Sequence, residues 1–178
     1  AMAIRLKEQM GIKKIHDRET ELINKTFTEL KKIKGIHILA DRITDRLGVF
    51  SFYADKIHHN LFTKLLNDRF GIQVRGGCSC AGTYGHFLLN VGFKLSNEIT
   101  EKIEAGDLSL KPGWIRLSLH PTMTDEELDF ILNAIKEVVR YASQWENDYV
   151  YDIHTNEFHH RSFREKDSSD YSNWFEFD

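Results

Sequence analysis

The residues best suited to chemistry lie in one glycine-rich segment that holds both cysteines of the chain. It reads Arg75-Gly76-Gly77-Cys78-Ser79-Cys80-Ala81-Gly82. A cysteine reacts as its thiolate, and nearby cations such as a guanidinium group stabilise that form. Glycines give the backbone the freedom to move a thiol from one position to another. The segment therefore predicts a reactive thiol on a mobile loop beside an arginine.

A second segment, Gly113-Trp114-Ile115-Arg116, presents a lone arginine on a predicted strand. Successive side chains of a strand point to opposite faces of its sheet. Over residues 114–119, one face therefore carries Ile115, Leu117 and Leu119, and the other face carries Trp114, Arg116 and Ser118. The planar fork of Arg116 suits two-pronged binding of a carboxylate. Together the two segments suit sulfur chemistry on a small carboxylate substrate.

Each candidate also has a structural interpretation. A cysteine such as Cys80, taken alone, is more often a small buried hydrophobe than a nucleophile. Cys78 fits that interpretation more easily, or acts as a second thiol. Arg116 can instead pair with a carboxylate, and Arg75 can serve to position the loop. A metal site is not expected, because two cysteines without further thiols or a converging set of histidines do not complete one.

The nine histidines add weaker candidates. Adjacent histidines, at 58–59 and at 159–160, point in different directions on regular structure, which favours solvated or capping roles. His86 and His120 lie near the two motifs in the sequence. We therefore treat these two, together with Cys78, as candidates for lining the site.

The elements that must position these residues follow an α+β pattern. Apolar residues at helical spacing predict helices over residues 4–33 (with a break near Gly11), 58–70 and a stretch after Thr124. Thr124 and Glu127 have the spacing of a capping box. Enrichment in β-branched and aromatic residues predicts strands over residues 36–39, 49–53, 72–75 and 114–119. We expect a small, mostly antiparallel sheet packed on helices.

Composition favours a soluble cytoplasmic domain. The chain has 178 residues, 41% hydrophobic and 29% charged, which suits one domain with a real core. No apolar run approaches the roughly 20 residues that cross a bilayer, and no signal peptide is visible. Cys78 and Cys80, separated by one residue, are poor disulfide partners, so reduced thiols are expected.

The C-terminal region, residues 143–178, differs from the rest. Residues 145–178 contain nine acidic and three basic residues, while the whole chain has a net charge of -3. No basic stripe is present, so nucleic acid is not an expected partner. The region is also rich in aromatic residues, which argues against simple disorder. We expect this acidic, aromatic extension to pack on its own domain, on another domain or on a partner.

The two motifs resemble the C-terminal, small domain of class V aminotransferase-like enzymes, which are fold-type I enzymes that use pyridoxal 5'-phosphate. The nearest group is the cysteine desulfurases and selenocysteine lyases, whose loop reads Arg-x-Gly-x-x-Cys-Ala. Arg75, Gly77, Cys80 and Ala81 match its four specified positions. Arg116 falls where the family carries the arginine that grips the substrate's α-carboxylate. The resemblance covers roughly residues 1–142 and departs from the family at Cys78, where a histidine is usual.

The resemblance implies that the Schiff-base lysine and the phosphate-binding residues belong to a preceding large domain. We therefore expect an excised C-terminal region with its small domain over residues 1–142, entered by the helix over residues 4–33. We expect no cofactor-binding residue in this chain and no activity of the chain alone. The resemblance also implies a homodimer in the full-length enzyme.

The family mechanism gives the leading hypothesis. The carboxylate of L-cysteine lies on Arg116, with Arg75 nearby, while Cys80 takes the substrate's sulfur as a persulfide and alanine is released. Selenocysteine is handled in the same way in the lyases, and a sulfur-acceptor protein is a possible partner. Two other hypotheses stay open: another class V aminotransferase or epimerase in which Cys80 has no catalytic role, and a non-enzymatic interaction domain.

Overall fold

The computed structural model describes residues 2–78 and 82–162. A four-stranded antiparallel sheet, in the order β1-β2-β4-β3, organises this part of the chain. Its strands are β1 (Ile36–Ile38), β2 (Val49–Ala54), β3 (Arg75–Gly77) and β4 (Trp114–Ser118). The expected α+β architecture with a mainly antiparallel sheet is confirmed.

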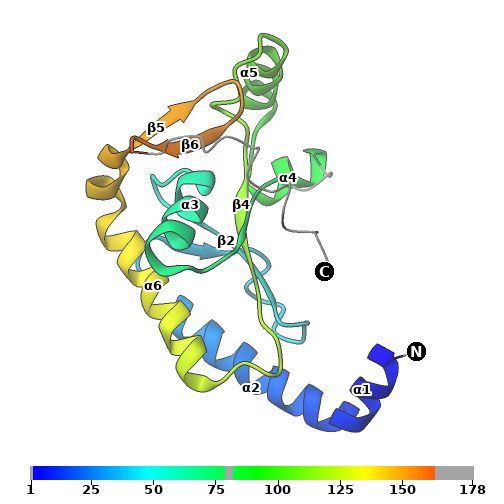
Figure 1. Cartoon of the computed structure of the whole chain (residues 1–178). Coiled ribbons are helices and arrows are strands. Elements are labelled where there is room, and N and C mark those ends of the chain that lie inside the picture. The colour runs from blue at the N-terminus through cyan, green and yellow to red at the C-terminus, as the bar shows by residue number, and fades with distance from the viewer. Residues whose placement is uncertain (1, 79–81, 163–178) are drawn as a thin grey trace, which may run out of the picture.

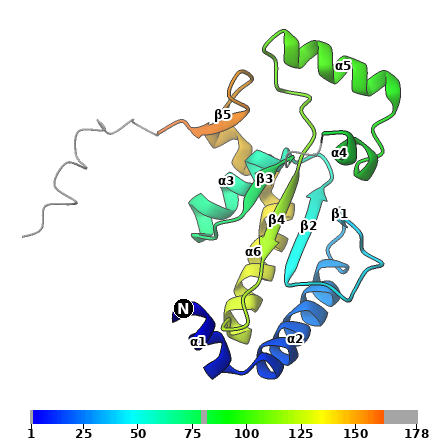
Figure 2. The ribbon, with the colours of Figure 1, turned by 90° about the vertical axis from the view of Figure 1, so that its right-hand side faces the viewer.

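Helices cover one face of this sheet. The described helices are α1 (Met2–Met10), α2 (Ile12–Leu30), α3 (His59–Phe70), α4 (Gly82–Leu88), α5 (Phe93–Glu104) and α6 (Asp125–Trp145), followed by the short 3-10 turn η1 (Glu146–Asp148). The long helices α2 and α6 pack on each other, and α3 packs on α6 and on β4. Figures 1 and 2 show these three helices on the same side of the sheet.

The core lies between the sheet and these helices. Phe50, Phe52 and Ile115 are fully buried on the sheet side. The apolar stripe of α6 meets them, and its buried members are Leu128, Ile131, Leu132, Ile135 and Val138. The expected capping box starts α6, because Thr124 Oγ1 accepts a hydrogen bond from the Glu127 amide at 3.1 Å and Glu127 Oε2 accepts one from the Thr124 amide at 2.8 Å. Both orphan donors are thereby satisfied.

Several expected boundaries were wrong for local reasons. The first helix does break at Gly11, which has φ +85°, but it ends at Leu30 rather than at residue 33. The strand expected over residues 72–75 is β3, Arg75–Gly77, instead. The Ile72 amide bonds to the Leu66 carbonyl at 3.1 Å, so Ile72 completes the left-handed cap of α3 at Gly71. The sequence pattern assigned neither α4 nor α5.

The acidic region after α6 begins with a hairpin of β5 (Tyr149–Asp152) and β6 (Glu157–His160). This hairpin packs on α3. Asn60 Nδ2 donates to the Asn156 carbonyl at 2.5 Å, and the Tyr149 hydroxyl donates to Asp68 Oδ2 at 3.0 Å. Phe158 belongs to the same buried cluster as the sheet. Residues 163–178, with the rest of the aromatic side chains, lie outside the described residues.

Among the residues that the structure describes, no helix combines the length and the apolar character that crossing a bilayer requires.

Candidate functional site

The two arginines of the motifs are direct neighbours on the sheet. In the antiparallel register of β3 and β4, Arg75 lies opposite Arg116, and on the other side of β4 Ser51 lies opposite Arg116. Side chains directly opposite one another project to the same face, with Cβ atoms about 5 Å apart. Ile115, next to Arg116, is buried against the helices. The guanidinium groups therefore point to the face that α2, α3 and α6 leave uncovered.

This pair of like charges favours an anion between them. Like charges placed directly opposite one another destabilise a strand pair. Within the described part of the chain, neither Arg75 nor Arg116 forms an ion pair with a carboxylate. Arg116 is half-buried, where a charge-assisted hydrogen bond is stronger than on the open surface. These two guanidinium groups, called the arginine clamp below, are placed so that both can contact one anion.

An apolar hollow lies on the same face of the sheet. It has a volume of about 430 Å³, and its lining includes Leu39, Val49, Ser51, Tyr84, Leu88 and Trp114. Helix α4, which lies beside β4 in Figure 2, supplies the wall opposite the sheet. A Cβ atom on Gly85 would lie 3.4 Å from Trp114 Cζ3, so α4 approaches Trp114 closely. This contact explains why Trp114 is only 8% exposed although it shares the face of Arg116.

The cysteine loop starts where β3 ends. Cys78 follows Gly77, which lies opposite Trp114, and a Cβ atom on Gly85 would lie 2.8 Å from Cys78 Sγ. The sulfur of Cys78 thus lies against the backbone of α4. Cys80, the expected nucleophile, falls outside the described residues, and its role stays a prediction.

The two candidate histidines lie at different ends of β4. His86 Nδ1 is 3.0 Å from Ser96 Oγ, which ties α4 to α5 near the cysteine loop. His120 lies beyond the other end of β4, where its Nδ1 is 2.6 Å from Thr122 Oγ1 in the turn before α6. The structure therefore places His86 on the cysteine side of the sheet and His120 away from it.

His58 and His59 do not point in different directions as expected. Their rings stack, with centroids 4.3 Å apart. His58 lies outside the helix as the N-cap of α3, where its Nδ1 accepts from the Asn60 amide, so the helical offset between neighbours does not apply. The capping role is confirmed for His58. His59 is instead 6% exposed, and its ring fills the space that a Cβ atom on Gly113 would occupy, 2.5 Å from Nε2.

The buried imidazole of His59 predicts a pH-dependent stability. Burial, with smaller effects of His58 and Lys111, lowers the pKa of His59 from 6.5 to about 3. Between these two pKa values, His59 is protonated in the unfolded chain and neutral in the folded chain. The free energy of unfolding keeps its highest value with respect to this group above the unfolded pKa of about 6.5. It falls as the pH drops below 6.5, by at most about 1.4 kcal/mol per pH unit. Urea denaturation as a function of pH should show this slope.

The matched variants isolate the effect of the buried imidazole. His59→Phe keeps a ring in the space next to Gly113 and removes the titrating group, so the acid slope should become shallower. His16→Gln, which changes an exposed histidine of α2, should leave the slope unchanged. Equal slopes in the wild type and in His59→Phe would show that His59 is not the group responsible.

The arginine face does not provide a site for pyridoxal phosphate. That cofactor needs a lysine for its aldehyde carbon and a protein group at its pyridine nitrogen. The three strands that carry the arginine face, β2, β3 and β4, contain no lysine. Lys64 and Lys111 line a groove beside α3, on the helix-covered side of the sheet. Strands β2, β3 and β4 therefore offer two guanidinium groups for an anion and no lysine for the cofactor's aldehyde carbon.

Comparisons with known proteins concern the family and the overall fold. A family model described as aminotransferase class-V matches residues 1–131. The apo structure of a cysteine desulfurase from Thermococcus onnurineus NA1 is 25% identical with a TM-score of 0.55, and the match covers 77% of this chain and 29% of that chain. The S-sulfonic acid form of the cysteine desulfurase CsdA from Escherichia coli is 19% identical with a TM-score of 0.44, and the match covers 70% of this chain and 25% of that chain.

The chain therefore spans less than a third of the length of these two desulfurases. A search of curated proteins gave no match.

Proposed function

The chain belongs to the aminotransferase class-V family, and on that premise we propose that it is the substrate-binding small domain of a pyridoxal-phosphate-dependent cysteine desulfurase or selenocysteine lyase. The observation that carries the proposal is the pairing of Arg75 with Arg116 on the uncovered face of the sheet, next to the strand end that leads into the cysteine loop. The structural likeness to the Thermococcus desulfurase supports the same choice.

In this proposal the arginines hold and orient the substrate. Arg116 binds the α-carboxylate of L-cysteine in a two-pronged contact, and Arg75 stabilises the same negative charge from the neighbouring strand. The apolar hollow bounded by Trp114 and Leu88 excludes water from one side of the bound amino acid. Fixing the carboxylate in this way limits the positions that the substrate's sulfur can take.

Cys80 then accepts the sulfur. Its thiolate forms a new S–S bond with the substrate's sulfur as the C–S bond breaks. The electron pair of that bond goes to the carbon, which takes up the proton of the substrate's thiol and leaves as alanine. Pyridoxal phosphate, when bound by the large domain that the resemblance implies, would supply the electron sink for the carbon centre. An acceptor protein then removes the sulfur from Cys80. In this proposal the full-length enzyme is a homodimer and acts in the cytoplasm.

The same clamp also serves a second candidate function. A class V aminotransferase or epimerase needs Arg116 for a carboxylate and makes no use of Cys80. The two functions differ in their product, because only the desulfurase converts L-cysteine to alanine and a protein-bound persulfide.

A comparison of two preparations tests the proposal. The isolated chain should neither develop the visible absorbance of lysine-bound pyridoxal phosphate nor release alanine from L-cysteine, because the strands that carry its arginine face contain no lysine. The enzyme in which this chain is joined to a cofactor-binding large domain should do both. Alanine is measured by chromatography after incubation with L-cysteine. Absorbance and alanine from the isolated chain would contradict the assigned division of roles.

A further inference from the structure

We propose that the groove beside α3 is a docking site for an extended, acidic peptide segment of a partner protein, which adds as a strand to the outer edge of β3. The groove, called the α3 groove below, has a volume of about 820 Å³. It lies on the helix-covered side of the sheet, away from the arginine clamp. Binding there requires neither cofactor nor amino-acid substrate, so the inference goes beyond the proposed function.

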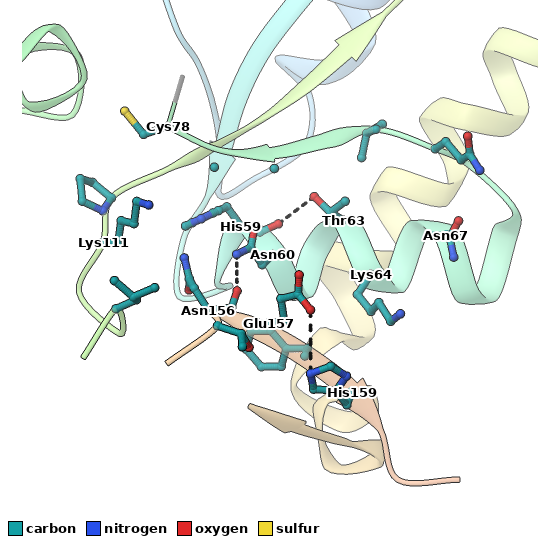
Figure 3. A pocket seen from close by; sticks show the side chains of 18 residues that line it. His59, Asn60, Thr63, Lys64, Asn67, Cys78, Lys111, Asn156, Glu157 and His159 are labelled. Atoms are coloured by element: carbon teal, nitrogen blue, oxygen red, sulfur yellow. Dashed lines mark hydrogen bonds and ion pairs between the residues drawn. The ribbon is translucent and has the colours of Figure 1, made fainter. Parts of the chain in front are cut away.

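The floor of the α3 groove is a polar face of α3. Asn60, Thr63, Lys64 and Asn67 line it at the spacing of one helical face. Figure 3 shows these side chains between β3 and the β5–β6 hairpin. Amide and hydroxyl groups both donate and accept hydrogen bonds. A floor of this kind suits the alternating N–H and C=O groups of a peptide better than an apolar ligand.

The two walls are strands whose outer edges have no strand partner among the described elements. β3 pairs with β4 alone and β6 pairs with β5 alone. An unpaired edge is a template for a further strand, and proteins usually protect it with bulky or charged side chains. β3 ends in Gly76 and Gly77, and both of these residues, which carry no side chain, line the groove. The backbone of this edge is therefore accessible from the groove.

The shape favours an extended ligand over a compact one. At its far end the α3 groove meets a second hollow of about 570 Å³, because Lys64 and Asn67 line both. The track runs from Cys78 past Lys64 to Asp68. From Asn60 to Asp68 the helix rises about 12 Å, at about 1.5 Å per residue. That length matches about four residues of extended chain.

The charges select an acidic segment. Lys111 lies toward the Cys78 end and Lys64 toward the far end (Figure 3). Lys111 has no carboxylate partner among the described residues, and Lys64 Nζ is 3.9 Å from its nearest one, at Asp68. Glu157, a groove carboxylate, is 3.9 Å from His159 Nε2. Lys111 and Lys64, at two separated points of the track, complement a peptide with two separated carboxylates.

The test uses three hexapeptides with blocked termini. The first has aspartate at both ends and alternating threonine and serine between them. The second has lysine in place of both aspartates, and the third has proline in place of both serines. We expect the first to shift the backbone amide NMR signals of Gly76, Gly77 and His159, with an affinity at least about tenfold above that of either control. Proline removes the amide donors that strand pairing needs.

Charge-reversal variants locate the site. Lys64→Glu and Lys111→Glu should each weaken binding of the aspartate peptide by about tenfold. Lys14→Glu, on the exposed surface of α2, is the matched control and should have no effect. Equal binding of the proline peptide would overturn strand addition. Equal binding of the lysine peptide, unchanged affinity in both groove variants, or no shift of the groove signals would overturn the docking site. None of these outcomes depends on desulfurase activity.

Discussion

Arg116→Ala is expected to lower kcat/KM for L-cysteine about 100-fold in the assembled enzyme. A hydrogen bond to a charged group contributes about 1.5–3 kcal/mol, and about 2.7 kcal/mol corresponds to this factor. The half-buried position of Arg116 on β4, an interior strand of the sheet, places it at the upper part of that range. Arg116→Lys should recover only part of the loss, because an ammonium group cannot form the two-pronged contact. Steady-state kinetics with L-cysteine measures both variants.

A control variant and a double variant show whether the loss of kcat/KM is specific to the paired arginines. Arg140→Ala, on the exposed side of α6, should keep the wild-type kcat/KM. Arg75→Ala combined with Arg116→Ala should cost less than the sum of the two single effects, because both guanidinium groups act on one carboxylate. Wild-type kinetics in Arg116→Ala, with L-cysteine and with other amino acids, would show that the paired arginines do not hold the substrate.

Cys80→Ser is expected to abolish release of alanine from L-cysteine, whereas Cys78→Ser should have a milder effect. A serine hydroxyl is not ionised at neutral pH and does not take up sulfur as a thiolate does. Cys80 directly precedes Ala81 at the family's nucleophile position, while the sulfur of Cys78 lies against the backbone of α4 at Gly85. Single-turnover assays of alanine separate the two variants. Undiminished alanine production by Cys80→Ser would leave the aminotransferase-like alternative.

Local sequence signals predicted much of the fold. The capping box at Thr124 and Glu127 and the alternation along β4 depend on neighbouring residues, and both were found as expected. The strand expected over residues 72–75 was wrong because a backbone bond from Ile72 to Leu66 extends the cap of α3. The stacking of His58 on His59 was also missed, since it depends on His58 lying just outside the helix.

The candidate site was predictable only in part. Alternation predicted the face of Arg116, but its pairing with Arg75 depends on the register of two strands far apart in the sequence. The α3 groove gave no sequence signal, because its floor and walls come from α3, β3 and the β5–β6 hairpin. No periodic pattern connects such segments. Only the tertiary structure brings them together.

The location of the transferred sulfur tests the central claim most directly. The assembled enzyme is exposed briefly to L-cysteine, alkylated and digested, and the peptides are analysed by mass spectrometry. We predict one added sulfur on the fragment ions that contain Cys80, none on Cys78, and loss of the signal in Cys80→Ser. Alanine release without added sulfur on Cys80, or with the sulfur on Cys78, would contradict the account.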